Sequence, residues 1–248
     1  MLNITLKFIG TSDTAGLPVY GCDCAACSMY RKSGRRNGPS CAYIEFEDNV
    51  IFIDSGSDTF LQIREEKQFL AQFLTHFHAD HAYGLLRLRH MAVNAPCYHP
   101  KDDKGFADLL IRGHGFEFIE NTPFESVRVA NLEFTPIPLL HTRPTHGYLI
   151  KTPNKTIAYL TDCSGIGEQS LDFLRKTDLD AVFVDASYDV EYSEGKHLNF
   201  NQANKLIELI DAHEGFLIHQ SHYSLSYILN HKISLKYPYI SENFIYDI

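Results

Sequence analysis

The sequence lacks any long apolar run, and this bears on where the protein works. None of its 248 residues lie in an uninterrupted apolar stretch of the ~20 residues that are needed to cross a bilayer. Residues 1–10 have neither a charged start nor a long apolar core with a cleavage site, so they do not resemble an export signal. We therefore expect a cytoplasmic protein, in which clustered cysteines bind metal more often than they form disulfides.

Positive charge is also scarce. The 22 Lys and Arg residues are outnumbered by 31 Asp and Glu residues, which gives a formal net charge of −9. Nucleic acids and anionic membranes attract surfaces that are rich in Lys and Arg, so neither is expected as a stable partner. A small ligand bound in a local site is the better expectation.

Linkers, internal repeats and low-complexity tracts are missing too. Apolar residues make up 44% of the chain and charged residues 21%, as in ordinary globular proteins. Short apolar runs such as residues 41–46 and 156–160 alternate with turn residues, and helices are expected over residues 82–90 and 201–213. The sequence therefore predicts one α/β domain, residues 1–248, with two β-rich halves and helices outside them, an αββα sandwich.

Four potential metal ligands stand within six positions in the stretch LTHFHADHAYG. His76, His78, Asp80 and His81 directly follow the apolar run 69–74, a predicted strand. Isolated histidines are common in a chain that has 13 of them, but this density is not. Imidazole and carboxylate ligands together suit Zn²⁺, Mn²⁺ or Fe²⁺ in a site open to water. The stretch therefore predicts ligands for two adjacent ions.

Three later residues occupy equivalent places at the ends of apolar runs. His141 follows residues 137–140, Asp162 follows the strand 157–160, and His219 follows residues 216–218. Loops at strand ends can reach a shared crevice, so these three side chains are the candidates that complete both sites.

Together, HFHADH, a lone His, the Asp of YLTDCSG and the His of LIHQSH resemble the metallo-β-lactamase superfamily over essentially the full length. The resemblance implies a four-layer αββα sandwich of two β-sheets flanked by helices. It also implies two divalent ions, Zn²⁺ or Mn²⁺, bridged by Asp162. The first ion would be held by His76, His78 and His141, and the second by Asp80, His81 and His219. Flavodiiron oxidoreductases of this fold carry Glu in place of His78, so hydrolysis is favoured over oxygen or nitric oxide reduction.

A second cluster of ligands lies in GLPVYGCDCAACS. Cys22, Cys24 and Cys27 are spaced so that their thiolates can share one ion, and a closed structural zinc site needs a fourth ligand. His222, three residues after His219, is the candidate for that place. A small zinc-binding loop is thus predicted near residues 20–28. The other cysteines are isolated and are expected to be ordinary reduced residues: Cys41, Cys97 and Cys163.

This cysteine segment and IHQSH resemble the PhnP-type phosphodiesterases of the phosphonate-degradation (carbon–phosphorus lyase) pathway. The resemblance implies hydrolysis of small phosphodiesters, cyclic ones such as cyclic ribose phosphates or 2′,3′-cyclic nucleotides, and a homodimer. A hydroxide bridging the metals would attack phosphorus, with Asp80 orienting its proton. His197 in GKHLNFNQ would be the general acid; the alternative is that it only occupies an exposed loop.

Other readings stay open. The same hydroxide could cleave a lactone, thioester or β-lactam, and the chain could be a non-catalytic metal-binding protein, as the pyrroloquinoline quinone biogenesis group suggests. Transfer-RNA processing shares the fold, but the acidic balance counts against it. Arg143 and His146 could contact a second phosphate or serve the structure, and Asp185 could support a ligand from outside.

Overall fold

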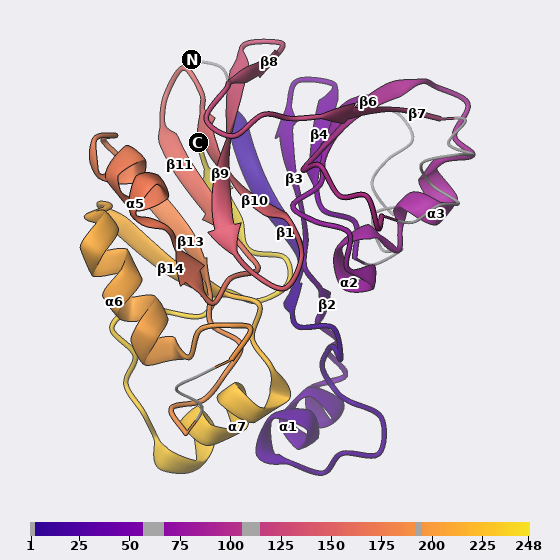
Figure 1. Ribbon diagram of the computed structural model, residues 1–248. Helices are drawn as coiled ribbons and strands as arrows, with labels where there is room; N and C mark the ends of the chain where they lie inside the picture. The colour runs from indigo at the N-terminus through magenta and orange to yellow at the C-terminus, as the bar shows by residue number, and fades with distance from the viewer. Residues whose placement is uncertain (1–2, 57–66, 106–114, 192–194) are drawn as a thin grey trace.

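The computed structural model describes residues 3–56, 67–105, 115–191 and 195–248. Two β-sheets pack face to face and helices cover their outer faces (Figure 1), which confirms the predicted αββα arrangement. The two chain ends lie close together, since the amide of Ile248 donates to the carbonyl of Ile4 over 2.8 Å. No helix of the described residues is long and apolar enough to span a membrane.

The first sheet is built mostly from the N-terminal half and has the order β15-β1-β3-β4-β5-β6-β7, with β2 beside β1. Its strands are β1 (Ile4–Ser12), β2 (Gly38–Pro39), β3 (Cys41–Phe46), β4 (Asn49–Ile53), β5 (Gln68–Phe73), β6 (Ala95–His99), β7 (Phe116–Glu120) and β15 (Ile245–Asp247). The hairpin β3–β4 is antiparallel, while β4, β5, β6 and β7 run parallel to one another.

The second sheet has the order β12-β9-β10-β11-β13-β14, with β8 beside β9. Its strands are β8 (Val127–Val129), β9 (Leu132–Leu140), β10 (Thr145–Lys151), β11 (Thr156–Leu160), β12 (Gly165–Ile166), β13 (Ala181–Asp185) and β14 (Glu214–Ile218). The strands β11, β13 and β14 are parallel, so their carboxyl ends meet at one edge of the sheet.

Aromatic side chains fill the space between the two sheets. Phe73 of β5 stacks on Phe134 of β9 with ring centroids 3.9 Å apart, and Phe8 contacts Phe183 at 5.0 Å. All four rings are fully buried, so the contacts combine area burial with favourable ring geometry. This core fixes the two sheets relative to each other and thereby places their strand ends together.

Helices of different lengths cover the outer faces: α1 (Ala25–Ser33), α2 (Ala79–Ala82), α3 (Leu85–Leu88), α5 (Glu168–Arg175), α6 (Phe200–Ile210) and α7 (His222–His231). The first turn of α6 is stabilised by a capping box between Asn199 and Gln202. The helix ends earlier than the predicted residue 213, because Asp211 takes a left-handed conformation at φ 64°. Figure 1 shows α1 and α7 side by side at one end of the molecule, where Ala26 N donates to Ser226 Oγ over 3.0 Å.

Candidate metal centre

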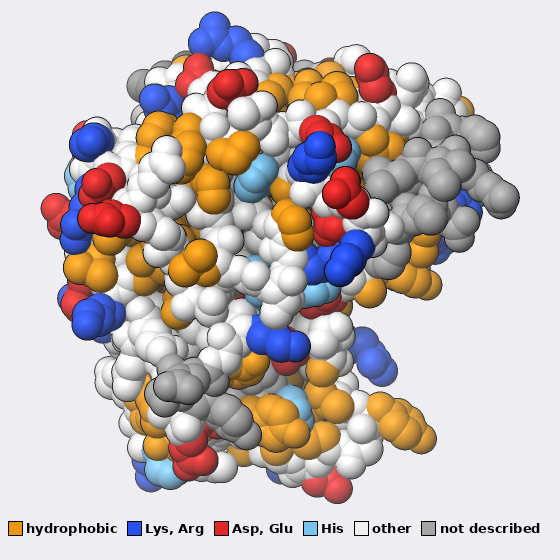
Figure 2. All heavy atoms as spheres, viewed as in Figure 1, with side chains coloured by type: hydrophobic (Ala, Val, Ile, Leu, Met, Phe, Trp, Pro, Cys, Tyr) orange, Lys and Arg blue, Asp and Glu red, His pale blue; other side chains and the backbone are white. Residues whose placement is uncertain are grey.

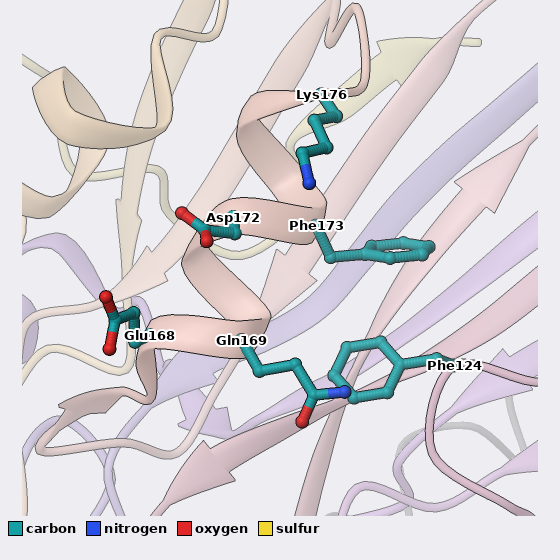
Figure 3. A pocket seen from close by; sticks show the side chains of 6 residues that line it. All are labelled: Phe124, Glu168, Gln169, Asp172, Phe173 and Lys176. Carbon is teal, nitrogen blue, oxygen red and sulfur yellow. The ribbon is translucent and has the colours of Figure 1, made fainter.

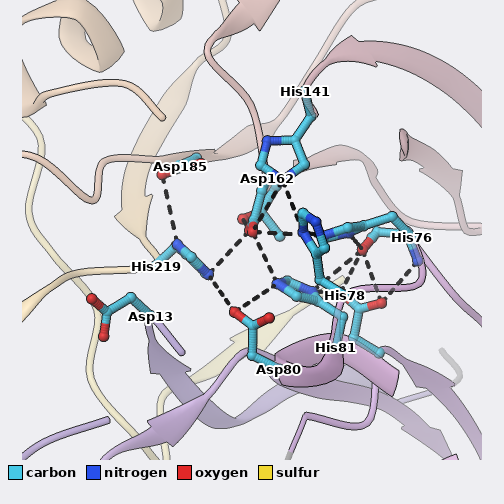
Figure 4. Close-up of polar contacts among 12 residues, drawn as sticks. Asp13, His76, His78, Asp80, His81, His141, Asp162, Asp185 and His219 are labelled. Carbon is cyan, nitrogen blue, oxygen red and sulfur yellow. Dashed lines mark hydrogen bonds and ion pairs between the residues drawn. The ribbon is translucent and has the colours of Figure 1, made fainter. Parts of the chain in front are cut away.

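Four of the predicted ligands meet in a first pocket between the two sheets. His76 and His78 follow β5, His141 lies between β9 and β10, and Asp162 follows β11 (Figure 4). His78 Nδ1 lies 2.8 Å from His76 Nε2 and 3.1 Å from His141 Nε2. The four ligand atoms all lie within 4.8 Å of one another, a spacing that a single cation can bridge.

A second pocket shares Asp162 with the first. Its Oδ2 atom lies 3.1 Å from His81 Nε2, and its Oδ1 atom lies 3.1 Å from His219 Nε2. Asp80 Oδ2 is 3.8 Å from the same nitrogen of His81 and 3.7 Å from that of His219. The structure thus gathers the seven residues expected around two ions, with Asp162 between the pockets.

The pattern of hydrogen bonds tests whether cations fit there. Both His81 Nε2 and His219 Nε2 are buried and make no hydrogen bond, although each lies 3.1 Å from an oxygen of Asp162. Buried polar atoms are nearly always satisfied, so two orphaned nitrogens around one carboxylate are what a bound cation would explain. Three or four imidazole and carboxylate groups per pocket also suit Zn²⁺ or Mn²⁺. The residues present therefore fit two divalent ions.

The first pocket is prepared to bind a metal without releasing protons. Burial, together with the neighbouring His81, holds the pKa of His76 well below its usual value. Burial and the neighbouring His141 lower the pKa of His78 to about 4. Both imidazoles are consequently neutral at pH 7, which is the form that coordinates metal.

The second pocket has the opposite character. Burial works against ionisation of Asp80, but His219 and His81 lower the pKa of Asp80 to about 2. Burial works against the charged form of His219 too, yet Asp162 raises the pKa of His219 to about 9. For His81, Asp162 and Asp54 outweigh burial and raise the pKa well above its usual value. Without metal, this pocket is a set of paired opposite charges, and an ion entering it displaces protons.

Asp54, which sequence reasoning did not single out, holds His81 from behind. Its Oδ2 atom accepts hydrogen bonds from His81 Nδ1 over 2.6 Å and from the Thr75 hydroxyl over 2.8 Å, and its Oδ1 atom accepts one from the Thr75 amide over 2.8 Å. This contact fixes which ring nitrogen of His81 faces Asp162. The position of Asp54 directly after the strand β4 was the only indication in the sequence. Asp54 was missed because no His, Cys or acidic residue stands beside it.

His197 lies at the centre, as the resemblance implied. Its ring centroid is 5.1 Å from that of His141 and 5.1 Å from that of His219. Asp185 Oδ2 accepts a hydrogen bond from His197 Nδ1 over 2.7 Å. Burial lowers the pKa of His197, but the contact with Asp185 outweighs it and the pKa is raised. His197 can thus carry a proton near neutral pH beside both pockets.

Asp185 has a second contact that the sequence does not reveal. Its Oδ1 atom accepts from Ser187 Oγ over 2.9 Å, and that hydroxyl lies 2.6 Å from His219 Nδ1. One buried carboxylate at the end of β13 therefore orients both His197 and, through Ser187, the ligand His219.

The cysteine cluster forms at the junction of α1 and α7. The Nδ1 atom of His222 lies 3.3 Å from the sulfur of Cys22, 3.5 Å from that of Cys24 and 3.8 Å from that of Cys27. Burial raises the pKa of Cys24, but hydrogen bonds, the largest from Ser226, lower it to about 6. Four ligands without an open position fit a structural zinc. The remaining three cysteines are buried in hydrophobic clusters: Cys41, Cys97 and Cys163.

Arg143 and His146, for which two roles were open, both make structural contacts. Arg143 donates to Asp102 Oδ2 over 2.8 Å and to the carbonyl of Phe77 over 2.8 Å. His146 Nδ1 lies 2.7 Å from the side-chain oxygen of Asn121. Arg143 thus holds the peptide between the candidate ligands His76 and His78.

A hollow of about 510 Å³ lies elsewhere, on the outer side of α5. Figure 3 shows its lining of two aromatic rings and charged side chains of both signs: Phe124, Glu168, Gln169, Asp172, Phe173 and Lys176. It contains no histidine or cysteine, and the groups of candidate metal ligands among the described residues lie at the strand ends and in the cysteine cluster.

Comparison with known proteins gives a consistent result. A family model described as "Beta-lactamase superfamily domain" matches residues 51–220. An octanoyltransferase of Porphyromonas gingivalis (strain ATCC BAA-308 / W83) is 27% identical over an alignment 241 positions long, which covers 87% of this chain and 46% of that protein. The chain therefore spans about half the length of the curated relative it matches.

Solved structures with the same fold cover nearly the whole chain. A diphosphatase of the PhnP family has a TM-score of 0.82 and 24% identity, covering 100% of this chain and 98% of its own. Zinc-bound PqqB from Methylobacterium extorquens has a TM-score of 0.76 and 16% identity, covering 98% of this chain and 100% of its own. Both likenesses concern the fold.

Proposed function

The chain belongs to the metallo-β-lactamase superfamily, and we propose that it is a hydrolase that uses two divalent ions, zinc or manganese, to cleave small phosphodiesters. The observation that carries this proposal is Asp162, whose two oxygens face two separate pockets of histidine and aspartate. Retention of every expected ligand supports a working enzyme rather than a degenerate relative.

The chain's own residues supply the proton transfers. Two divalent ions, held by the histidines and aspartates of the two pockets, would lower the pKa of a bound water and neutralise charge on the phosphate oxygens. Asp80, at the edge of the second pocket, orients the proton of that water. As the water oxygen bonds to phosphorus, the bond from phosphorus to the leaving oxygen breaks. His197, held by Asp185, donates its proton to that oxygen.

Phosphorus is favoured as the electrophile by the likeness to a PhnP-family diphosphatase and by the segment GLPVYGCDCAAC with its partner His222. A preference for cyclic esters, a place in phosphonate metabolism and a homodimer stay predictions from the resemblance, and a cytoplasmic location stays a prediction from the sequence.

The test compares a poor leaving group with a good one. Protein reconstituted with manganese or zinc should hydrolyse both 2′,3′-cyclic AMP, which releases an alkoxide, and bis(p-nitrophenyl) phosphate, which releases a stabilised phenolate. In His197→Ala, hydrolysis of the cyclic nucleotide should fall by about 10²-fold, the usual contribution of a general acid, while the aryl ester is largely spared. Metal content should not change. An unaltered rate on the cyclic nucleotide would remove His197 from the mechanism.

A matched control is His213→Ala. His213 is an exposed histidine that pairs with Asp178 over 3.2 Å, away from the metal pockets, and its loss should leave both rates unchanged.

A second candidate is hydrolysis of an acyl thioester by the same site. It is favoured by the relative named as an octanoyltransferase, although the chain spans only 46% of that protein. Assaying an octanoyl thioester beside the two phosphodiesters separates the candidates. Two bound ions with no turnover of any ester would instead support a non-catalytic metal-binding role.

A further inference from the structure

The three-residue segment Gly195–Lys196–His197 is held against both metal pockets. His141 Nδ1 donates to the carbonyl of Lys196 over 3.0 Å, and His197 Nδ1 donates to Asp185 over 2.7 Å. The backbone of Lys196 is therefore bonded to His141, a candidate ligand of the first pocket. The next residue, His197, is bonded to Asp185, the carboxylate that also orients His219 of the second pocket.

Close packing fixes the segment from its other side. A Cβ atom added to Gly195 would come within 2.5 Å of the Tyr188 ring, so that ring and the backbone are in direct contact. The same ring meets the ring of His197 edge-on, with centroids 5.6 Å apart and an angle of 86°. The position of Lys196 is thus determined by contacts at three successive residues.

The side chain of Lys196 is exposed while its backbone is held. Arg143, another cation near the site, is already engaged by Asp102 and the carbonyl of Phe77. Lys196 makes no ion pair with any residue that the structure describes. Figure 2 shows Lys and Arg side chains near the middle of this face with Asp and Glu side chains among them, and the chain as a whole carries a net charge of −9.

We propose that Lys196 is a specificity residue that binds an anionic leaving group, so that the substrates of this site include phosphoanhydrides such as substituted diphosphates. The proposal rests on the proposed function. Lys196 directly precedes His197, the candidate general acid, and its carbonyl is bonded to His141, a candidate ligand of the first pocket. A flexible four-carbon stem that ends in an ammonium group is well suited to follow a phosphate as it moves away.

The chemistry of the two leaving groups explains why adjacent residues serve them. In a phosphoanhydride, the water oxygen bonds to one phosphorus and the bond from that phosphorus to the bridging oxygen breaks. The bridging oxygen keeps the electron pair and leaves within a phosphate monoester, while the water's proton passes to solvent. Because the second pKa of such a monoester is about 6, it departs without a proton and needs a positive charge instead. An alkoxide has the opposite need, for a proton from His197.

The test therefore crosses two variants with two substrates. ADP-ribose provides a diphosphate linkage, and 2′,3′-cyclic AMP provides an ester with an alkoxide leaving group. Lys196→Gln should lower kcat/KM for ADP-ribose by about tenfold, the size of one hydrogen bond to a charged group, and change it for the cyclic ester by less than about twofold. Lys196→Glu should lower the ADP-ribose value further. His197→Ala should show the reverse preference.

Lys205→Gln is the matched control, because Lys205 is an exposed lysine of α6 and its loss removes the same charge. It should leave both substrates unaffected. Equal losses on both substrates in Lys196→Gln, or no loss on either, would overturn the role of Lys196. The same holds if the wild-type protein cleaves the cyclic ester but not ADP-ribose. If the metal-loaded protein cleaves neither, the proposed function falls as well.

Discussion

The contrast between the two pockets predicts that the two ions bind with different proton release. At pH 7, which is below the pKa of about 9 to which His219 is raised, the His219 imidazole is mostly protonated in the metal-free protein. His81, whose pKa is also raised, contributes close to one further proton. His78, with a pKa of about 4, and His76 are already neutral. We therefore expect about zero protons released by the first ion and about two by the second.

Calorimetric titration with Mn²⁺ in buffers of different ionisation enthalpy measures this number directly. Mn²⁺ is the suitable ion because the thiolates of the cysteine cluster favour softer metals, so their protons do not enter the count. In His219→Gln, the release at the second step should fall from about two protons to about one. Equal release at both steps, or none at the second, would refute the assignment of charges to the second pocket.

Two substitutions behind the ligands test the supporting carboxylates. Asp54→Asn removes the charge that orients His81, so the affinity for the second ion should fall by about 10–100-fold while the first still binds; manganese stoichiometry measured by equilibrium dialysis decides this. Asp185→Asn removes the largest influence that raises the pKa of His197. Because a general acid works only while protonated, the activity lost as pH rises should be lost at a lower pH than in the wild type. An unshifted alkaline limb of the pH–rate profile on 2′,3′-cyclic AMP would contradict the pairing.

Many of the strands could be predicted from the sequence, because a buried strand appears there as a short apolar run. The strands β3 (Cys41–Phe46) and β11 (Thr156–Leu160) begin and end at the predicted residues. The candidate ligand histidines could also be predicted from the sequence. They directly follow strands, and strand ends are where residues far apart in the chain come together.

Several helices were harder to predict from the sequence, because tertiary contacts determine where they begin and end. The short helix predicted over residues 82–90 is present but covers only Leu85–Leu88 (α3), and a separate helix, α2, ends at Ala82 just before Gly84. The amide of Gly84 donates to the carbonyl of Ser55 over 2.7 Å, so the chain is drawn toward the end of β4 instead of continuing one helix. The helices α1 and α7 were not predicted, because cysteines and polar residues interrupt their apolar pattern and they are stabilised mainly by each other.

Asp54 and Asp185 show which functional contacts the sequence alone does not predict. Each is a single carboxylate after a strand, and its importance comes from a partner that is 27 residues away for Asp54 and 12 for Asp185. Residue type and local spacing carry no trace of such pairings, which depend on how the strand ends are brought together.

Only Gln220 and Ser221 separate His219 from His222, so the second metal pocket and the cysteine cluster each take a residue from one short segment of backbone. Gln220 is itself fastened to the end of β1, where its carbonyl accepts from Ser12 Oγ over 2.9 Å. Oxidation of the thiols would therefore act beyond the cysteine cluster: once His222 lost its sulfur contacts, the segment that carries His219 would lose one of the contacts that hold it in place.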